Sequence, residues 1–188
     1  MMKVSSEEKL LQNSIAMTVA LVSFGMLFAS MFLGYFLVRF NSPVWPPVEI
    51  ENIPQLLPFL STLVMALSSY TYWRMEKVAL NDEGAGKKFW SYTFVLGLAF
   101  LVLQWVLWGT LKSRGITVAN GWVTSMVYAF TWVHAAHILG ALGTLVWLKK
   151  FVFKKREELT DVKLINVGKF WHFLGVIWLI IYLMMFVL

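Results

Sequence analysis

Cysteine is absent from the 188-residue sequence, and charged residues make up only 14% of it. The absence of cysteine excludes disulfides, thiolate metal sites and a cysteine nucleophile. About a quarter of the residues in a soluble domain are charged, whereas this chain is 59% hydrophobic and has a mean hydropathy of +0.69. The composition therefore indicates a membrane protein.

Proline is also scarce, and its five residues all fall between positions 43 and 58. The chain holds five long apolar runs without Asp, Glu, Lys or Arg, at residues 14–38, 55–73, 89–111, 123–148 and 170–188. Each approaches or exceeds the roughly 20 residues that a helix needs to cross a bilayer, and backbone groups in lipid must be satisfied within the segment. We predict an all-α fold, a polytopic membrane helix bundle with five transmembrane helices that forms one domain over residues 1–188.

The run at residues 55–73 is the least apolar because it contains several Ser and Thr residues, whose hydroxyls can bond to the carbonyls of their own helix. The proline-rich stretch before it, residues 41–55, cannot continue a helix. We expect this stretch to form an irregular cap at the membrane surface.

The loops set the orientation. Thirteen of the sixteen Lys and Arg residues fall in the N-terminal segment and in the second and fourth loops, which share one side of a five-helix chain. The other side has only Arg39, Lys112 and Arg114. Because cytoplasmic loops are enriched in Lys and Arg, we predict an N-terminus inside and a C-terminus outside. These loops account for the net charge of +6 without a nucleic-acid partner.

Tryptophan is abundant, with ten residues. Several lie near the ends of the predicted helices, where an aromatic belt is expected at the membrane–water interface: Trp45, Trp73, Trp90, Trp108, Trp122 and Trp147.

Three histidines lie in the apolar runs. His134 and His137 are three residues apart and share one face of the fourth predicted helix, and His172 opens the fifth. Ionisable residues within a membrane are functional candidates. They admit three interpretations: haem or metal ligation, a proton relay, and structural polar contacts between helices.

Two of these interpretations fit the sequence poorly. One haem needs ligands from opposite sides, so His137 and His172 would have to pair, yet at 1.5 Å per residue they lie about 18 Å and about 5 Å from the inner edge of the membrane. A proton relay usually places carboxylates in the helices, and these runs have none. We therefore favour structural contacts between helices, made by His134, His137, His172, Gln104 and Thr131. We predict no catalytic residue, cofactor or metal site in this chain.

Several motifs resemble those of subunit III of the haem–copper terminal oxidases. The stretch "TWVHAAHILG", which contains His134 and His137, resembles the family's "LTGxHGxHVxxG". The stretch "FWHFLGVIWLIIYL", which contains His172, resembles "YWHFVDVVWLFLF". The stretch "LGLAFLVLQWVLW", which contains Gln104, resembles "LGLxFLxLQxxEW". The turn "NDEGAGKK" is similar to the "EGDRxG" loop. The resemblance covers most of the chain, and five helices are typical of the short bacterial form.

The resemblance implies a function. It implies an accessory, non-redox subunit of a proton-translocating oxidase in the bacterial inner membrane. The haems and copper of that oxidase are expected in partner chains. The implied partners are the catalytic subunit I, other oxidase subunits and membrane lipid, including structural phospholipid in a cleft. Cytochrome c is the favoured electron donor. A quinol oxidase subunit, an independent transporter and a cytochrome b-like carrier are the alternatives.

Two departures from the family pattern concern acids. Phe24 in "SFGMLF" and Leu107 in "LQWVLW" occupy positions where the family usually has a carboxylate. Any part of the family's role that needs those acids is not expected in this chain.

Overall fold

The computed structural model describes residues 6–42, 55–79, 82–152 and 158–187. Within these ranges the chain is helical and contains no strand. The long helices are α1 (Ser6–Asn41), α3 (Leu56–Val78), α4 (Glu83–Ser113), α5 (Trp122–Val152) and α6 (Glu158–Tyr182). A 3-10 turn, η1 (Val118–Asn120), precedes α5, and a π-helical turn, η2 (Leu183–Val187), follows α6. The predicted helix bundle is confirmed, while the predicted proline-rich cap, with Trp45, lies largely outside the described residues.

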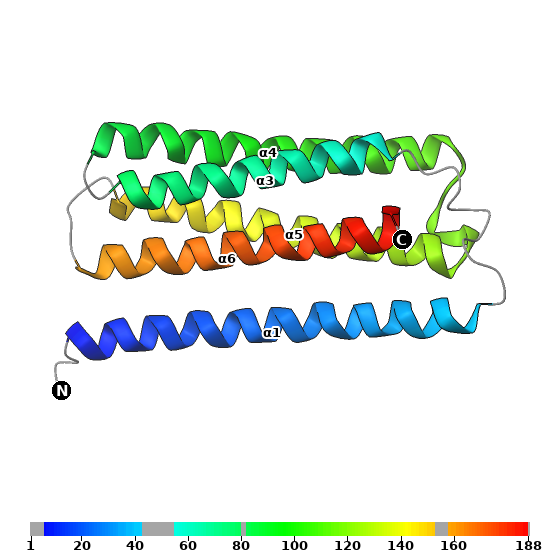
Figure 1. The fold of residues 1–188 in the computed structure, drawn as a ribbon, viewed down its shortest axis with the longest axis horizontal. Helices are drawn as coiled ribbons and strands as arrows, with labels where there is room; N and C mark the ends of the chain where they lie inside the picture. The colour runs from blue at the N-terminus through cyan, green and yellow to red at the C-terminus, as the bar shows by residue number, and fades with distance from the viewer. Residues whose placement is uncertain (1–5, 43–54, 80–81, 153–157, 188) are drawn as a thin grey trace.

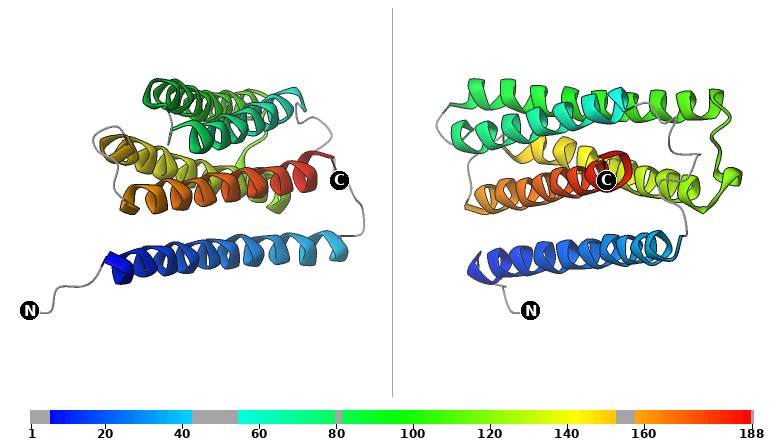
Figure 2. Two further views of the ribbon diagram at one scale, coloured as in Figure 1. Left: turned by 60° about the vertical axis from the view of Figure 1, so that its left-hand side comes forward. Right: turned by 45° about the vertical axis from the view of Figure 1, so that its right-hand side comes forward.

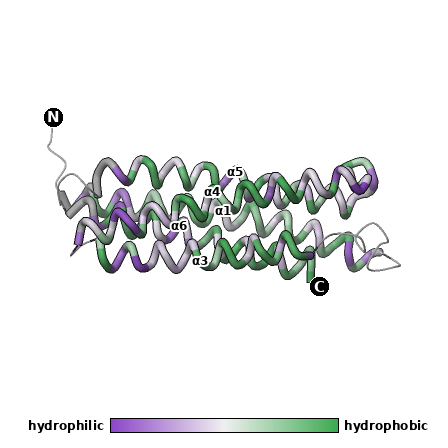
Figure 3. Tube along the Cα trace, turned by 90° about the horizontal axis from the view of Figure 1, so that it is seen from above, coloured by the Kyte–Doolittle hydropathy of each residue, from purple (hydrophilic) through white to green (hydrophobic). Residues whose placement is uncertain are grey.

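The five helices lie roughly side by side along one axis (Figure 1). α3 and α4 form one layer, α5 and α6 the next, and α1 lies beyond α6 on the opposite side from α3 and α4 (Figures 1 and 2). Hydrophilic residues gather mainly toward the two ends of the bundle (Figure 3). α6 therefore takes the central place, because it packs against α1, α3 and α5.

Within the described part of the chain, four stretches are long and apolar enough to cross a membrane: Leu10–Asn41, Gly84–Ser113, Trp122–Lys149 and Asp161–Val187. α3 is not among them, although its 23 residues would suffice in length. Its hydroxyl residues lower its hydropathy, but Ser61 and Ser68 are fully buried in the bundle. The polar character of α3 is thus directed toward other helices.

Hydrogen bonds from aromatic side chains join α3 to α6. The indole of Trp171 donates to Ser68 Oγ at 3.1 Å, and the indole of Trp178 donates to Thr62 Oγ1 at 3.1 Å. The Tyr72 hydroxyl donates to the carbonyl of Leu164 at 2.8 Å. Both indoles belong to fully buried tryptophans, so these bonds satisfy groups that would otherwise be costly to bury.

The other helices are joined in the same way. Trp90 of α4 donates to the carbonyl of Leu145 in α5 at 3.0 Å. α1 is tied to the far end of the chain by Tyr35, whose hydroxyl donates to the carbonyl of Met184 at 2.9 Å, and by Asn166, which donates to the carbonyl of Asn13 at 3.2 Å.

α1 is the least enclosed helix. In an apolar 18-residue stretch of each helix, 6% of the α1 residues are buried inside the structure, against 28% for α4, 44% for α5 and 50% for α6. The outward face of α1 carries large apolar side chains such as Val19, Met26 and Leu33. This face is suited to lipid or to another membrane chain.

The predicted membrane orientation can be tested by introducing single cysteines, because the wild-type chain has none. Lys88 and Ser113 are exposed near opposite ends of α4. If the basic side is cytoplasmic, a membrane-impermeant maleimide should label Ser113→Cys in intact cells and Lys88→Cys only after permeabilisation. The label is read on this chain after electrophoresis. The reverse pattern would contradict the predicted orientation.

Gly168 allows α3 and α6 to approach closely. A Cβ added there would overlap Glu76 Oε1 and would lie 2.7 Å from Tyr72 Cε1. The Glu76 carboxylate is the end of a flexible side chain, but the Tyr72 ring is fully buried and hydrogen-bonded. Any side chain at position 168 must therefore push the two helices apart or displace that ring.

We expect Gly168→Ala to destabilise the bundle by about 1–3 kcal/mol, the usual cost of overpacking. The matched control is Gly143→Ala in α5, where the added Cβ would meet nothing within 4 Å. This control should be neutral or stabilising, since Ala favours a helix more than Gly does. Thermal unfolding in mild detergent measures both variants, and equal midpoints for the two would contradict the close-approach argument.

Candidate functional site

His134 lies at the centre of the bundle, enclosed by aromatic rings. It is fully buried, and its ring centroid lies 5.3 Å from that of Trp178, 5.6 Å from that of Phe100 and 6.3 Å from that of Phe28. Among the described residues, neither ring nitrogen has a hydrogen-bond partner. The sequence led us to expect a hydrogen bond from His134 to a neighbouring helix, whereas its interhelical contacts are ring contacts with α1, α4 and α6.

His137 lies one turn further along α5 and faces α1. Its Nδ1 atom is 2.7 Å from the carbonyl oxygen of Val133. A carbonyl can only accept, so Nδ1 carries the proton, and in the neutral ring Nε2 is left as an acceptor. The Phe24 ring meets the imidazole edge-on at 4.6 Å and 88°. The hydrogen bond of His137 is thus internal to α5, and its contact with α1 is aromatic.

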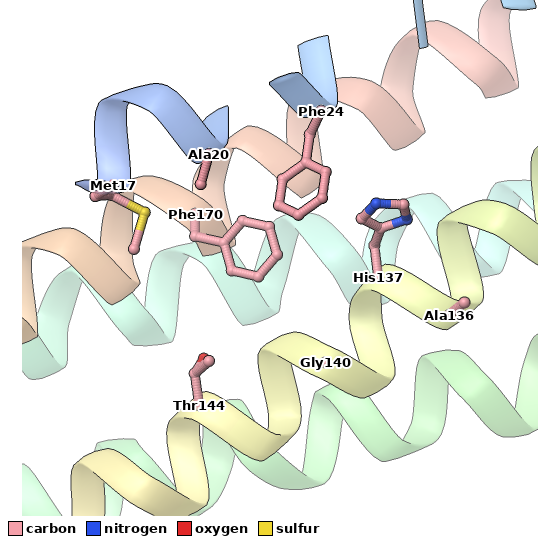
Figure 4. A pocket seen from close by; sticks show the side chains of 8 residues that line it. All are labelled: Met17, Ala20, Phe24, Ala136, His137, Gly140, Thr144 and Phe170. Atoms are coloured by element: carbon pink, nitrogen blue, oxygen red, sulfur yellow. The ribbon is translucent and has the colours of Figure 1, made fainter. Parts of the chain in front are cut away.

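A pocket opens beside His137 between α1, α5 and α6 (Figure 4). Its volume is about 560 Å³. Figure 4 shows the eight residues that line it: Met17, Ala20, Phe24, Ala136, His137, Gly140, Thr144 and Phe170. The Thr144 hydroxyl is already used, because it donates to the carbonyl of Ala141 at 2.7 Å. His137 Nε2 is therefore the one side-chain polar atom of this lining for which the described residues supply no partner.

The glycine in this pocket keeps it open. A Cβ added at Gly140 would meet nothing within 4 Å, so the backbone of α5 forms part of the wall. Across the pocket, Phe24 and Phe170 stack at 5.5 Å. The walls are almost wholly apolar, and they suit a hydrocarbon chain better than a polar ligand.

His172 lies apart from the other two histidines. Its ring contacts Tyr72 of α3 at 5.8 Å and 81°, whereas His137 faces α1. No group of three His, Cys, Asp or Glu side chains that could hold a metal ion occurs in the described parts of the chain. The three histidines are therefore not brought together into one ligand set.

The other two candidate residues do make hydrogen bonds between helices. Gln104 of α4 donates from Nε2 to Ser61 Oγ of α3 at 3.1 Å. Thr131 of α5 accepts from the indole of Trp108 in α4 at 3.0 Å and donates to the carbonyl of Val127. Gln104 Oε1 is buried with no partner among the described residues.

The sequence analysis missed the tryptophans that act as interhelical donors. Trp90 and Trp108 were expected in an aromatic belt, and the structure adds a second role, because their indoles donate to groups of α5. Trp171 and Trp178 received no role, and both are fully buried donors. Their spacing of seven residues, which puts both on one face of α6, was the available signal.

We expect opposite results from removing two polar groups of α5. His134→Leu replaces a buried group without hydrogen bonds by an apolar one of similar volume, and should be neutral or stabilising. Thr131→Val leaves the Trp108 indole without its acceptor and should cost about 1 kcal/mol. Thermal unfolding in detergent compares them. A large loss of stability in His134→Leu but not in Thr131→Val would reverse this assignment.

Comparison with known proteins adds independent information. The family model described as cytochrome c oxidase subunit III matches residues 8–188. A probable cytochrome c oxidase subunit 3 of Mycobacterium tuberculosis is 30% identical over 90% of this chain and 84% of its own length. Cytochrome c oxidase subunit 3 of Synechocystis is 25% identical over 89% of this chain and 72% of its own length. The haem–copper oxidase subunit I+III of Aeropyrum pernix is 26% identical over 89% of this chain and 22% of its own length.

Proposed function

Because the chain belongs to the cytochrome c oxidase subunit III family, and is therefore a multi-pass membrane subunit of a haem–copper oxidase, we propose that it serves as an accessory subunit that stabilises the catalytic subunit and holds structural phospholipid. The family membership favours this role over an independent transporter or a cytochrome b-like carrier. The membrane is the cytoplasmic membrane of a bacterium, and the electron donor of the complex is cytochrome c.

The pocket between α1, α5 and α6 is the observation that carries the lipid part of this proposal. It lies beside His137, between helices that are apolar enough to span a membrane. An acyl chain has the apolar surface that these walls can cover. Lipid in the pocket would contact α1 and α5 at once, which would strengthen the attachment of the least enclosed helix.

The exposed face of α1 supports the partner part of the proposal. Apolar side chains there meet lipid or another membrane chain, and the catalytic subunit I is the partner that the family suggests. The Aeropyrum pernix relative carries subunits I and III in one polypeptide. A comparable one-to-one association is what we propose for this chain.

The side chains of this subunit are poorly suited to hold a haem. A haem with two histidine ligands needs them on opposite sides of one iron, whereas His137 faces α1 and His172 faces α3. His134 is enclosed by rings on α1, α4 and α6, which occupy the space that a macrocycle would need. We therefore propose that the redox centres belong to partner chains, and that this subunit acts through packing.

The proposal is tested on the oxidase complex purified through a tag on this chain. Gly140→Phe fills the pocket, and we expect it to reduce the phospholipid that co-purifies and to shorten the working life of the enzyme during turnover. The reduced-minus-oxidised haem spectrum should stay unchanged. Phosphorus analysis, oxygen consumption over time and the spectrum measure these three effects.

Gly143→Phe is the matched control, because Gly143 lies on the same helix with open space around it and does not line the pocket. It should leave the bound phospholipid unchanged. A haem band retained by the isolated chain would overturn the non-redox role. An unchanged lipid content in Gly140→Phe would overturn the lipid role of this pocket.

A further inference from the structure

A second pocket lies between α4 and α5, at the end of the bundle where η1 joins them. Its volume is about 350 Å³. Six residues line it: Trp105, Trp108, Gly109, Lys112, Tyr128 and Trp132. None of them belongs to the pocket between α1, α5 and α6, and the proposed function makes no use of them.

The spacing of these residues aligns them on facing helix surfaces. On α4, Trp105, Gly109 and Lys112 follow one another at intervals of four and three residues, and so share a face. On α5, Tyr128 and Trp132 are four residues apart and share a face in the same way. Three indoles, one phenol and one ammonium group therefore converge on a single cavity.

Two of the aromatic walls are held in place. The Trp108 ring stacks on the Trp132 ring at 4.6 Å and 17°, and its indole is fixed by the hydrogen bond to Thr131. The Tyr128 hydroxyl donates to the carbonyl of Ile116 at 2.9 Å. The pocket is thus preformed, and a ligand would bind without first ordering these walls.

Other groups of the pocket are left available. Trp105 is 75% exposed. The indole nitrogens of Trp105 and Trp132 have no hydrogen-bond partner among the described residues, and the Lys112 ammonium has neither an ion pair nor a ring contact there. Residues 84–156, which include α5 and almost all of α4, contain no Asp or Glu. The elements that form the pocket therefore offer the Lys112 ammonium no carboxylate apart from Glu83 at the far end of α4.

This combination matches one kind of ligand. Lysine near the end of a membrane helix extends its ammonium toward the headgroup level, where tryptophan and tyrosine are also favoured. A phosphate oxygen can accept from the ammonium and from an indole N–H, while an acyl chain covers the aromatic faces. We propose that this pocket binds one phospholipid with an anionic headgroup, its phosphate at Lys112 and one acyl chain along Trp105 and Trp132.

Gly109 makes room for the chain. A Cβ at this position would meet nothing within 4 Å, so the backbone of α4 is open to the pocket between the two aromatic walls. An aromatic belt alone would spread its side chains around the bundle and would require no such opening. The site thus differs from a belt in its cavity and in its dependence on one charge.

The test uses the oxidase complex purified through a tag on this chain and placed in nanodiscs. The nanodiscs carry either phosphatidylglycerol or phosphatidylcholine with a diazirine on one acyl chain. After illumination, mass spectrometry maps the labelled peptides. We expect phosphatidylglycerol to label residues 105–132 at least threefold more than phosphatidylcholine. Lys112→Gln should reduce the phosphatidylglycerol labelling to the phosphatidylcholine level.

Two further variants distinguish loss of lipid binding from loss of the fold. Lys88→Gln removes an exposed lysine at the other end of α4 and should leave the labelling of residues 105–132 unchanged. Gly109→Leu fills the pocket and should abolish labelling by both lipids, while an unchanged thermal midpoint reports an intact bundle.

Three results would overturn the proposal. Equal labelling by both lipids in wild type would indicate an aromatic belt only. Unchanged phosphatidylglycerol labelling in Lys112→Gln would remove the role of the charge. Absence of label from both lipids at residues 105–132 in wild type, with label elsewhere on the chain, would indicate that another oxidase subunit covers the pocket. None of these results depends on the Gly140→Phe experiment, so the two lipid sites can fail separately.

Discussion

The bundle depends on the need to satisfy indole N–H groups where no water is available. Trp171 and Trp178 project from α6 into the interior, and an unpaired N–H there would be costly. Ser68 and Thr62 on α3 supply the acceptors. This requirement explains why α3 is the least apolar helix: its hydroxyls serve as acceptors for the tryptophans of α6. The same requirement fixes the rotation of both helices, because the donors and acceptors must face one another.

The helices themselves could be predicted from the sequence because a run of about 20 residues without charged side chains indicates a helix that crosses the bilayer. The lower hydropathy of the second predicted helix was also visible in the sequence, from its Ser and Thr residues. What could not be predicted was the direction of each polar side chain. Periodicity assigns residues to a face of one helix, but it does not say which other helix that face meets. His134 and His137 share a face in the sequence, yet one lies in the core and the other beside an open pocket.

The structure shows how the side chains pack at the two positions where this chain departs from the family pattern. Phe24 packs edge-on against His137, so an aromatic contact occupies the place where the family usually has an acid. Leu107 is fully buried in the core, where a carboxylate would need a partner. Both replacements are apolar and both are packed. In this chain both positions therefore contribute hydrophobic contacts rather than carboxylate chemistry.

The central position of α6 has a consequence for synthesis. Its hydrogen bonds reach back to residues made much earlier: 103 positions from Trp171 to Ser68, 116 from Trp178 to Thr62, and 153 from Asn166 to Asn13. While α4 and α5 are entering the membrane, the acceptors on α3 still lack these donors. The hydrogen bonds that join α1 and α3 to α6 can therefore form only after α6 has been synthesised. Until α6 is inserted, the hydroxyls of Ser68 and Thr62 lack the indole donors that they meet in the folded bundle, so the early helices depend on a later one for these contacts.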